Sequence, residues 1–126
     1  MKDKIENLMS RPSLGLHFKK ENRGAAAVFH CRGAFSLGSY PQLNEISEEI
    51  RKTQAKKIVL NLRDVVYIDS TGLGTLATAL KDTRGASRDL VLVPSREVRE
   101  VLTLASLEKA FQVFENVDDA LRTPGA

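Results

Sequence analysis

The sequence predicts one α/β domain with a mostly parallel sheet of about five strands, which opens with a hairpin and carries about four helices. Three observations support this fold class. The chain has 126 residues, 42% of them hydrophobic, which is enough for one core. Two segments with strand-like alternation come first, and helical and strand-like patterns then alternate to the end. Such alternation implies right-handed crossovers between parallel strands.

The first predicted element is a hairpin. Residues 14–19 alternate between apolar and more polar side chains, which is typical of a half-buried strand. A turn at 21–24 leads into a second strand over 25–31, which Gly33 is expected to break.

Three helices are predicted from their capping residues and apolar periodicity. Ser39 is the expected N-cap of the first, with Pro41 in its first turn, and this helix ends near residues 54–55. The second follows Asp69, and the third has Ser95 as its N-cap. The predicted buried faces are Leu43, Ile46 and Ile50 in the first helix, Leu73, Leu76, Ala77 and Leu80 in the second, and Val98, Val101, Leu102 and Ala105 in the third.

Three further strands complete the predicted sheet. The apolar run at 57–62 indicates a strand buried on both faces, and 90–93 form another that Pro94 ends. Gly85 lies between these two strands and is expected just past the end of the second helix. Residues 111–114 form the last strand, and a short helix containing Val117, Ala120 and Leu121 closes the domain. The domain is expected over 13–122, between an N-terminal extension at 1–12 and a tail at 123–126.

The charge pattern and the single cysteine exclude several classes of function. The net charge of +3 comes from 19 basic and 16 acidic residues, which are interspersed and indicate a solvated surface rather than a nucleic-acid stripe. Cys31 is alone, so the chain has no intrachain disulfide and no cysteine-rich zinc site. No apolar run approaches the roughly 20 residues that span a bilayer. We therefore expect a cytoplasmic protein that binds neither nucleic acid nor membrane.

The sequence contains no pattern that supports catalysis. It lacks Gly-Lys-Ser/Thr and Gly-x-Ser-x-Gly motifs, and its acidic residues show no metal-site spacing. His17 and His30 fall on the two opening strands, where two histidines without a third ligand make a poor zinc site. Cys31 is interpreted as a buried structural thiol. We therefore expect no catalytic residue, no metal and no cofactor.

One loop between a predicted strand and helix carries the functional signal. The first N–H groups of a helix lack internal partners and carry the positive end of its dipole. A phosphate on Ser70 would add about −1.5 to −2 charges, which a helix N-terminus tolerates. The glycines keep the first turn bare, so that another protein's backbone can approach. From the local sequence alone, ordinary capping by Asp69 or Ser70 is the simpler interpretation. The loop consists of Asp69, Ser70, Thr71, Gly72, Leu73 and Gly74.

The segment from Val65 to Gly74 closely resembles the signature of STAS domains, specifically those of bacterial anti-sigma factor antagonists. The order of elements in that family also matches the order predicted above. The resemblance implies that an anti-sigma factor with serine-kinase activity phosphorylates the hydroxyl residue directly after Asp69. That residue is Ser70, with Thr71 the second candidate. The implied partner-binding residues are Ser36, Asp69, Ser70, Thr71, Gly72, Leu73 and Gly74.

The resemblance further implies a partner-switching cycle. The unphosphorylated chain, a monomer or weak dimer, binds the anti-sigma factor and so releases the sigma factor. Phosphorylation ends the binding, and a PP2C-type phosphatase restores it. The alternative is a non-phosphorylated STAS scaffold subunit of a stressosome-like or lipid-transport complex, and a small-ligand binder that uses the helix N-terminus is a third hypothesis.

One position departs from the family pattern. Many relatives carry an acidic residue in a Gly-Glu-Leu-Asp-like stretch after the second strand, whereas this chain has Ser36 at the end of residues 33–36. We therefore expect a partner that is complementary to a hydroxyl at this position.

Overall fold

The computed structural model describes residues 15–122. The expected extension at 1–12, the tail at 123–126 and Leu14 of the first predicted strand lie outside the described residues. Five strands form one sheet in the order β1-β2-β3-β4-β5. β1 pairs antiparallel with β2, and the other three pairings are parallel, as predicted. The strands are β1 (Leu16–Arg23), β2 (Ala26–Phe35), β3 (Lys57–Ile68), β4 (Asp89–Pro94) and β5 (Gln112–Val113).

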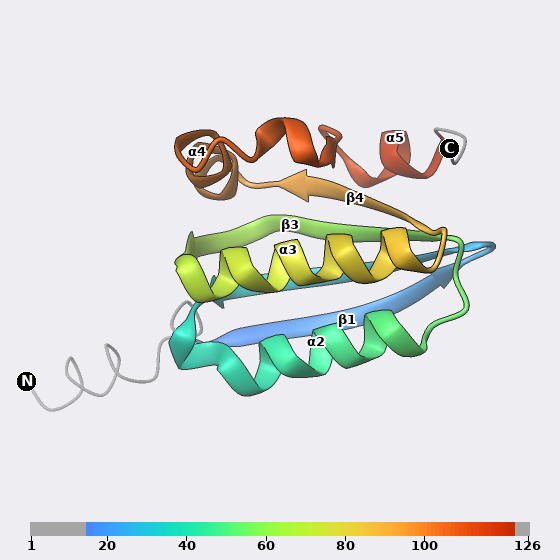
Figure 1. The fold of residues 1–126 in the computed structure, drawn as a ribbon, viewed down its shortest axis with the longest axis horizontal. Coiled ribbons are helices and arrows are strands. Elements are labelled where there is room, and N and C mark those ends of the chain that lie inside the picture. The colour runs from blue at the N-terminus through green and yellow to red at the C-terminus, as the bar shows by residue number, and fades with distance from the viewer. Residues whose placement is uncertain (1–14, 123–126) are drawn as a thin grey trace, which may run out of the picture.

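Helices cover both faces of this sheet (Figure 1). α2 and α3 lie side by side on one face and begin at the same end of the molecule, on the left in Figure 1. α5 packs against the other face, over β3 and β4. Four α-helices and two short 3₁₀ turns are described: η2 (Leu37–Ser39), α2 (Tyr40–Lys52), α3 (Ser70–Gly85), α4 (Arg96–Leu104), η3 (Glu108–Ala110) and α5 (Val117–Arg122).

The alternation of side chains along the strands produces two apolar layers. In β3, Ile58 and Leu60 point into the larger layer beneath α2 and α3, whereas Val59 points into the smaller layer with Ala120 of α5. This double burial explains why residues 57–62 read as a continuous apolar run. α4 adds Val98 and Leu102 to the larger layer.

Three strands run further than predicted. β1 continues to Arg23, because residues 21–23, which were expected in the turn, pair with β2. Gly33 was expected to break β2, but the strand continues to Phe35. Gly33 adopts a φ of +110° beside a register shift against β3, so its conformational freedom bends the strand without ending it. β3 continues to Ile68 rather than Leu62, because its last residues pair with the same extension of β2. By contrast, β5 has only two residues.

The helix predictions need three corrections. Ala77 and Ala105 were predicted to be buried, but both are exposed, and Ala79 and Thr83 take the buried positions on α3. Gly85 is the last residue of α3 rather than the first beyond it. Ser39 occupies the N-cap position of α2, yet its buried hydroxyl makes no capping hydrogen bond.

Candidate functional site

Asp69 connects β3 to α3 and organises the loop that carries the predicted acceptor. It has an extended backbone and is the N-cap of α3. Its Oδ1 accepts a hydrogen bond from the backbone N–H of Gly72 at 3.1 Å, and its Oδ2 accepts one from Leu37 at 3.1 Å. Asp69 rather than Ser70 is therefore the helix cap, and one carboxylate holds the end of β2 beside the start of α3.

The backbone donors around Asp69 keep its carboxylate ionised. Partial burial acts to raise the pKa of Asp69, but hydrogen bonds from the backbone N–H groups of Gly72, Leu37 and Thr71 act against it. The donors prevail, so the pKa of Asp69 lies below its usual value. A fixed negative charge therefore sits one residue before Ser70.

Gly72 brings the first turn of α3 into direct contact with the sheet. A Cβ atom at this position would lie 2.2 Å from the carbonyl oxygen of Phe35, which is too close for any side chain. The same carbonyl accepts a hydrogen bond from the N–H of Asp69 at 3.1 Å. Gly72 is buried, so the expected access for a partner's backbone applies to Gly74, which is exposed with nothing within 4 Å of a Cβ.

Ser70 is the first residue of α3 and its side chain is exposed. Within residues 15–122, its hydroxyl has no hydrogen-bond partner. Thr71, the other candidate acceptor, is half-buried, so Ser70 is the more accessible of the two. Leu73 is half-buried as well. A group attached to Ser70 would meet solvent and the positive end of the helix dipole.

Ser36 lies beside this loop. It follows β2 directly and precedes Leu37, whose N–H binds Asp69. Its side chain is half-buried, and its carbonyl accepts a hydrogen bond from Ser39 at 2.9 Å. The structure thus brings Ser36 to the same end of the sheet as Asp69 and Ser70, which lie more than thirty residues away in sequence.

Sequence reasoning missed a set of exposed apolar side chains at this end. Leu37 begins η2, Tyr40 begins α2, and Val66 and Tyr67 lie near the end of β3. Their exposed fractions are 69%, 58%, 48% and 55%, respectively. Large apolar side chains that stay exposed are available for contact with a partner. We call these four residues, which belong to the same end of the sheet, the apolar ring. The sequence feature that could have predicted this set is Leu37, an apolar residue within a turn of glycine and serine residues.

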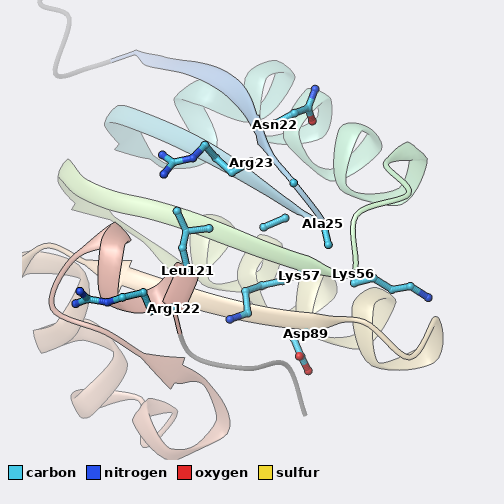
Figure 2. Close-up of a pocket in the computed structure, with 10 residues that line it drawn as sticks. Asn22, Arg23, Ala25, Lys56, Lys57, Asp89, Leu121 and Arg122 are labelled. Carbon is cyan, nitrogen blue, oxygen red and sulfur yellow. The ribbon is translucent and has the colours of Figure 1, made fainter.

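A cavity lies at the opposite end of the sheet (Figure 2). It measures about 670 Å³, and the hairpin turn, the starts of β3 and β4 and the end of α5 line it. Its basic side chains do not converge, since Lys56 and Arg122 point in different directions. Lys57 is buried and donates a hydrogen bond from Nζ to the carbonyl of Ala120 at 2.8 Å, which ties α5 to the sheet. Lys57 therefore serves the fold.

His30 and Cys31 are held in structural contacts, whereas His17 is exposed. Nε2 of His30 lies 2.8 Å from Oε1 of Glu21, and its Nδ1 lies 2.9 Å from Nδ2 of Asn61. Cys31 is buried, and burial raises the pKa of its thiol to about 12, so it is a poor nucleophile. The part of the chain that the structure describes holds no cluster of three potential metal ligands.

Over residues 15–122, no helix combines the length and the apolar character needed to cross a membrane.

Three comparisons relate the chain to known proteins. The model of the STAS domain family matches residues 17–120. The anti-sigma-B factor antagonist of Staphylococcus aureus (strain NCTC 8325 / PS 47) is 28% identical over 87 residues, which are 68% of this chain and 81% of that protein. The crystal structure of an anti-sigma factor antagonist from Mycobacterium paratuberculosis matches with a TM-score of 0.77 at 22% identity, over 84% of this chain and 91% of that one.

A further solved structure has the same fold. The anti-sigma factor antagonist SpoIIAA in its unphosphorylated form matches with a TM-score of 0.68 at 20% identity, over 83% of this chain and 93% of that one. The match to the family model, over residues 17–120, includes the Asp69 loop together with β3 and α3, which flank it.

Proposed function

The chain belongs to the STAS domain family, and from that membership we propose that it is an anti-sigma factor antagonist switched by phosphorylation of Ser70. The observation that carries the proposal is the exposed hydroxyl of Ser70, which begins α3 beside the apolar ring. A similarity to relatives named anti-sigma factor antagonists supports the same role.

In this proposal the unphosphorylated chain binds an anti-sigma factor through Ser36, the apolar ring and the loop from Asp69 to Gly74. Binding releases the sigma factor that the anti-sigma factor had held. The anti-sigma factor is a serine kinase and transfers a phosphate to Ser70, with Thr71 the second candidate acceptor. A PP2C-type phosphatase removes the phosphate and restores binding.

Electrostatics are sufficient for such a switch. A hundredfold loss of affinity corresponds to about 2.7 kcal/mol. A phosphate on Ser70 would bring about −1.5 to −2 charges into an interface that fits a neutral hydroxyl. The carboxylate of Asp69 is already ionised next to it, so the interface would have to bury two neighbouring anions.

The same location lets the phosphorylated chain stay folded. The exposed side chain of Ser70 leaves a phosphate in water, and the N-terminal dipole of α3 favours a negative charge there. We therefore expect phosphorylation to change affinity for the partner far more than the stability of the chain.

Ser36 contributes specificity in this proposal. It is half-buried next to Leu37 and supplies a hydroxyl where many relatives supply a carboxylate. An anti-sigma factor that binds this chain should therefore present a hydrogen-bonding group rather than a cation opposite Ser36.

The test uses purified kinase-type anti-sigma factors from the same genome with radiolabelled ATP. We expect one of them to label the wild-type chain and Thr71→Ala, but not Ser70→Ala. Ser70→Ala should bind that protein as the wild type does, and Ser70→Asp should bind at least about a hundredfold more weakly. If none of them binds or labels the wild type, and the chain instead elutes as a large assembly, the scaffold hypothesis replaces this one.

A further inference from the structure

A groove between α2 and α3 begins beside the proposed acceptor and runs along both helices. Its volume is about 340 Å³. Tyr40 and Thr71 line its beginning. Tyr40 belongs to the apolar ring, and Thr71 follows Ser70 directly in the sequence, so the groove begins next to both. Gly74 also lines it, and because a Cβ there would meet nothing within 4 Å, the wall is low at this point.

The residues that line the groove repeat at helical spacing and are almost all uncharged. Arg51 is the only charged member of the lining, and its guanidinium lies 3.4 Å from the carboxylate of Asp82. Charged residues make up 28% of the whole chain, so their near absence here is a local feature. Depletion of charge is typical of the centre of protein interfaces. Besides Leu43 and Gly74, the uncharged residues on the two walls are Tyr40, Asn44 and Ser47 from α2, and Thr71, Thr75 and Thr78 from α3.

Several of these polar groups are available to a partner. Thr75 donates its hydroxyl to the carbonyl of Thr71 at 3.1 Å. Asn44, Ser47 and Thr78 have no side-chain hydrogen-bond partner within residues 15–122. They can exchange water for partner hydrogen bonds without breaking any contact of the fold.

A protein interface of the usual size, centred on Ser70, would also cover this groove. A stable interface covers about 800 Å² on each partner, which as a disc has a radius of about 16 Å. With a rise of 1.5 Å per residue, Thr78 lies about 12 Å along α3 from Ser70. The neighbouring helix α4 instead exposes charges at Arg96, Glu97, Arg99 and Glu100, so the groove is the more suitable direction for the interface to extend.

We propose that this groove binds a second, uncharged segment of the same anti-sigma factor that accepts Ser70 in its active site. The proposal rests on the proposed function. It identifies the part of the surface that aligns the active site of the kinase with Ser70. Tyr40 anchors the segment where the groove meets the apolar ring, and Asn44, Ser47 and Thr78 bind it along the groove.

The test compares two neighbouring residues of α3 in the full chain, with the anti-sigma factor that labels Ser70 as the probe. Thr78→Arg places a long cation in the groove, whereas Ala77→Arg places the same side chain on an exposed position outside it. We expect Thr78→Arg to raise the Kd and the KM for phosphorylation at least about tenfold, and Ala77→Arg to change them less than about threefold. Asn44→Arg, on the opposite wall, should behave like Thr78→Arg.

The outcomes separate this inference from the proposed function. Circular dichroism and the Tm first establish that each variant is folded. If Thr78→Arg and Asn44→Arg bind and are labelled as the wild type while Ser70→Asp does not bind, the groove assignment is wrong and the proposed function stands. If the two arginine variants instead abolish self-association and leave binding to the anti-sigma factor intact, the groove belongs to a second copy of this chain. If no anti-sigma factor binds the wild type, both proposals fail.

Discussion

The backbone N–H of Leu37 donates a hydrogen bond to Oδ2 of Asp69 over 3.1 Å, so one carboxylate spans two segments 32 residues apart in sequence. The other oxygen of Asp69 caps α3 through Gly72. Part of the apolar ring and the proposed acceptor are therefore positioned by the same side chain.

Replacing Asp69 by Ala should weaken both the fold and partner binding. Loss of an N-cap costs about 0.5–2 kcal/mol, and the N–H of Leu37 loses its acceptor as well. Asn116→Ala is the matched control, since Asn116 Oδ1 accepts a hydrogen bond from the N–H of Asp119 at the start of α5, on the other face of the sheet from α3. Chemical denaturation and titration with the anti-sigma factor should show that both variants lose stability but only Asp69→Ala loses affinity. Equal losses of affinity would contradict the positioning role.

The stability of the chain should fall in acid through Asp69. Its pKa is lower in the folded chain than in the unfolded one, so its contribution is present above the unfolded pKa of about 3.9 and is lost as the pH falls through the folded pKa. Asp69→Asn should flatten the pH dependence of unfolding below about pH 4. Urea denaturation at a series of pH values measures this, and acid limbs that superimpose for the variant and the wild type would show that Asp69 does not carry it.

Gly72 and Gly74 should respond in opposite ways to the same change. Gly72→Ala forces a methyl group against the carbonyl of Phe35 and should cost about 1–3 kcal/mol or more. Gly74→Ala adds a methyl group in open space and should be neutral or stabilise by up to about 1 kcal/mol. Thermal denaturation of the two variants provides the comparison. A stable Gly72→Ala variant would mean that α3 can move away from β2.

The sequence was sufficient for the parallel sheet and for the loop at Asp69, because both depend on local patterns. Apolar runs, helical spacing and capping residues can each be read within about ten positions. Gly72 was misinterpreted as an access point because its constraint comes from Phe35, which only the folded chain brings next to it. Gly33 was misread for a similar reason, since pairing with both neighbouring strands keeps it in β2.

Lys57 and Lys56 should differ in what they contribute to α5. Lys57→Met keeps the apolar stem but removes the donor to Ala120, so the amides of α5 should exchange with solvent faster, by roughly tenfold for each 1.4 kcal/mol of lost protection. Lys56 is exposed, and Lys56→Met should leave the exchange of α5 unchanged. Hydrogen exchange measured by NMR resolves the two cases, and equal exchange in both variants would show that another contact holds α5.

The contact between Gly72 and Phe35 also bears on how fast the proposed switch can respond. With no space between the first turn of α3 and the sheet, a new group on Ser70 has only the solvent side to occupy, and the backbone beneath it stays in place. Phosphorylation would then change the surface of the chain and leave its backbone as it is. We expect its response time to be set by the proposed kinase and phosphatase, because the first turn of α3 has no room to move towards the sheet.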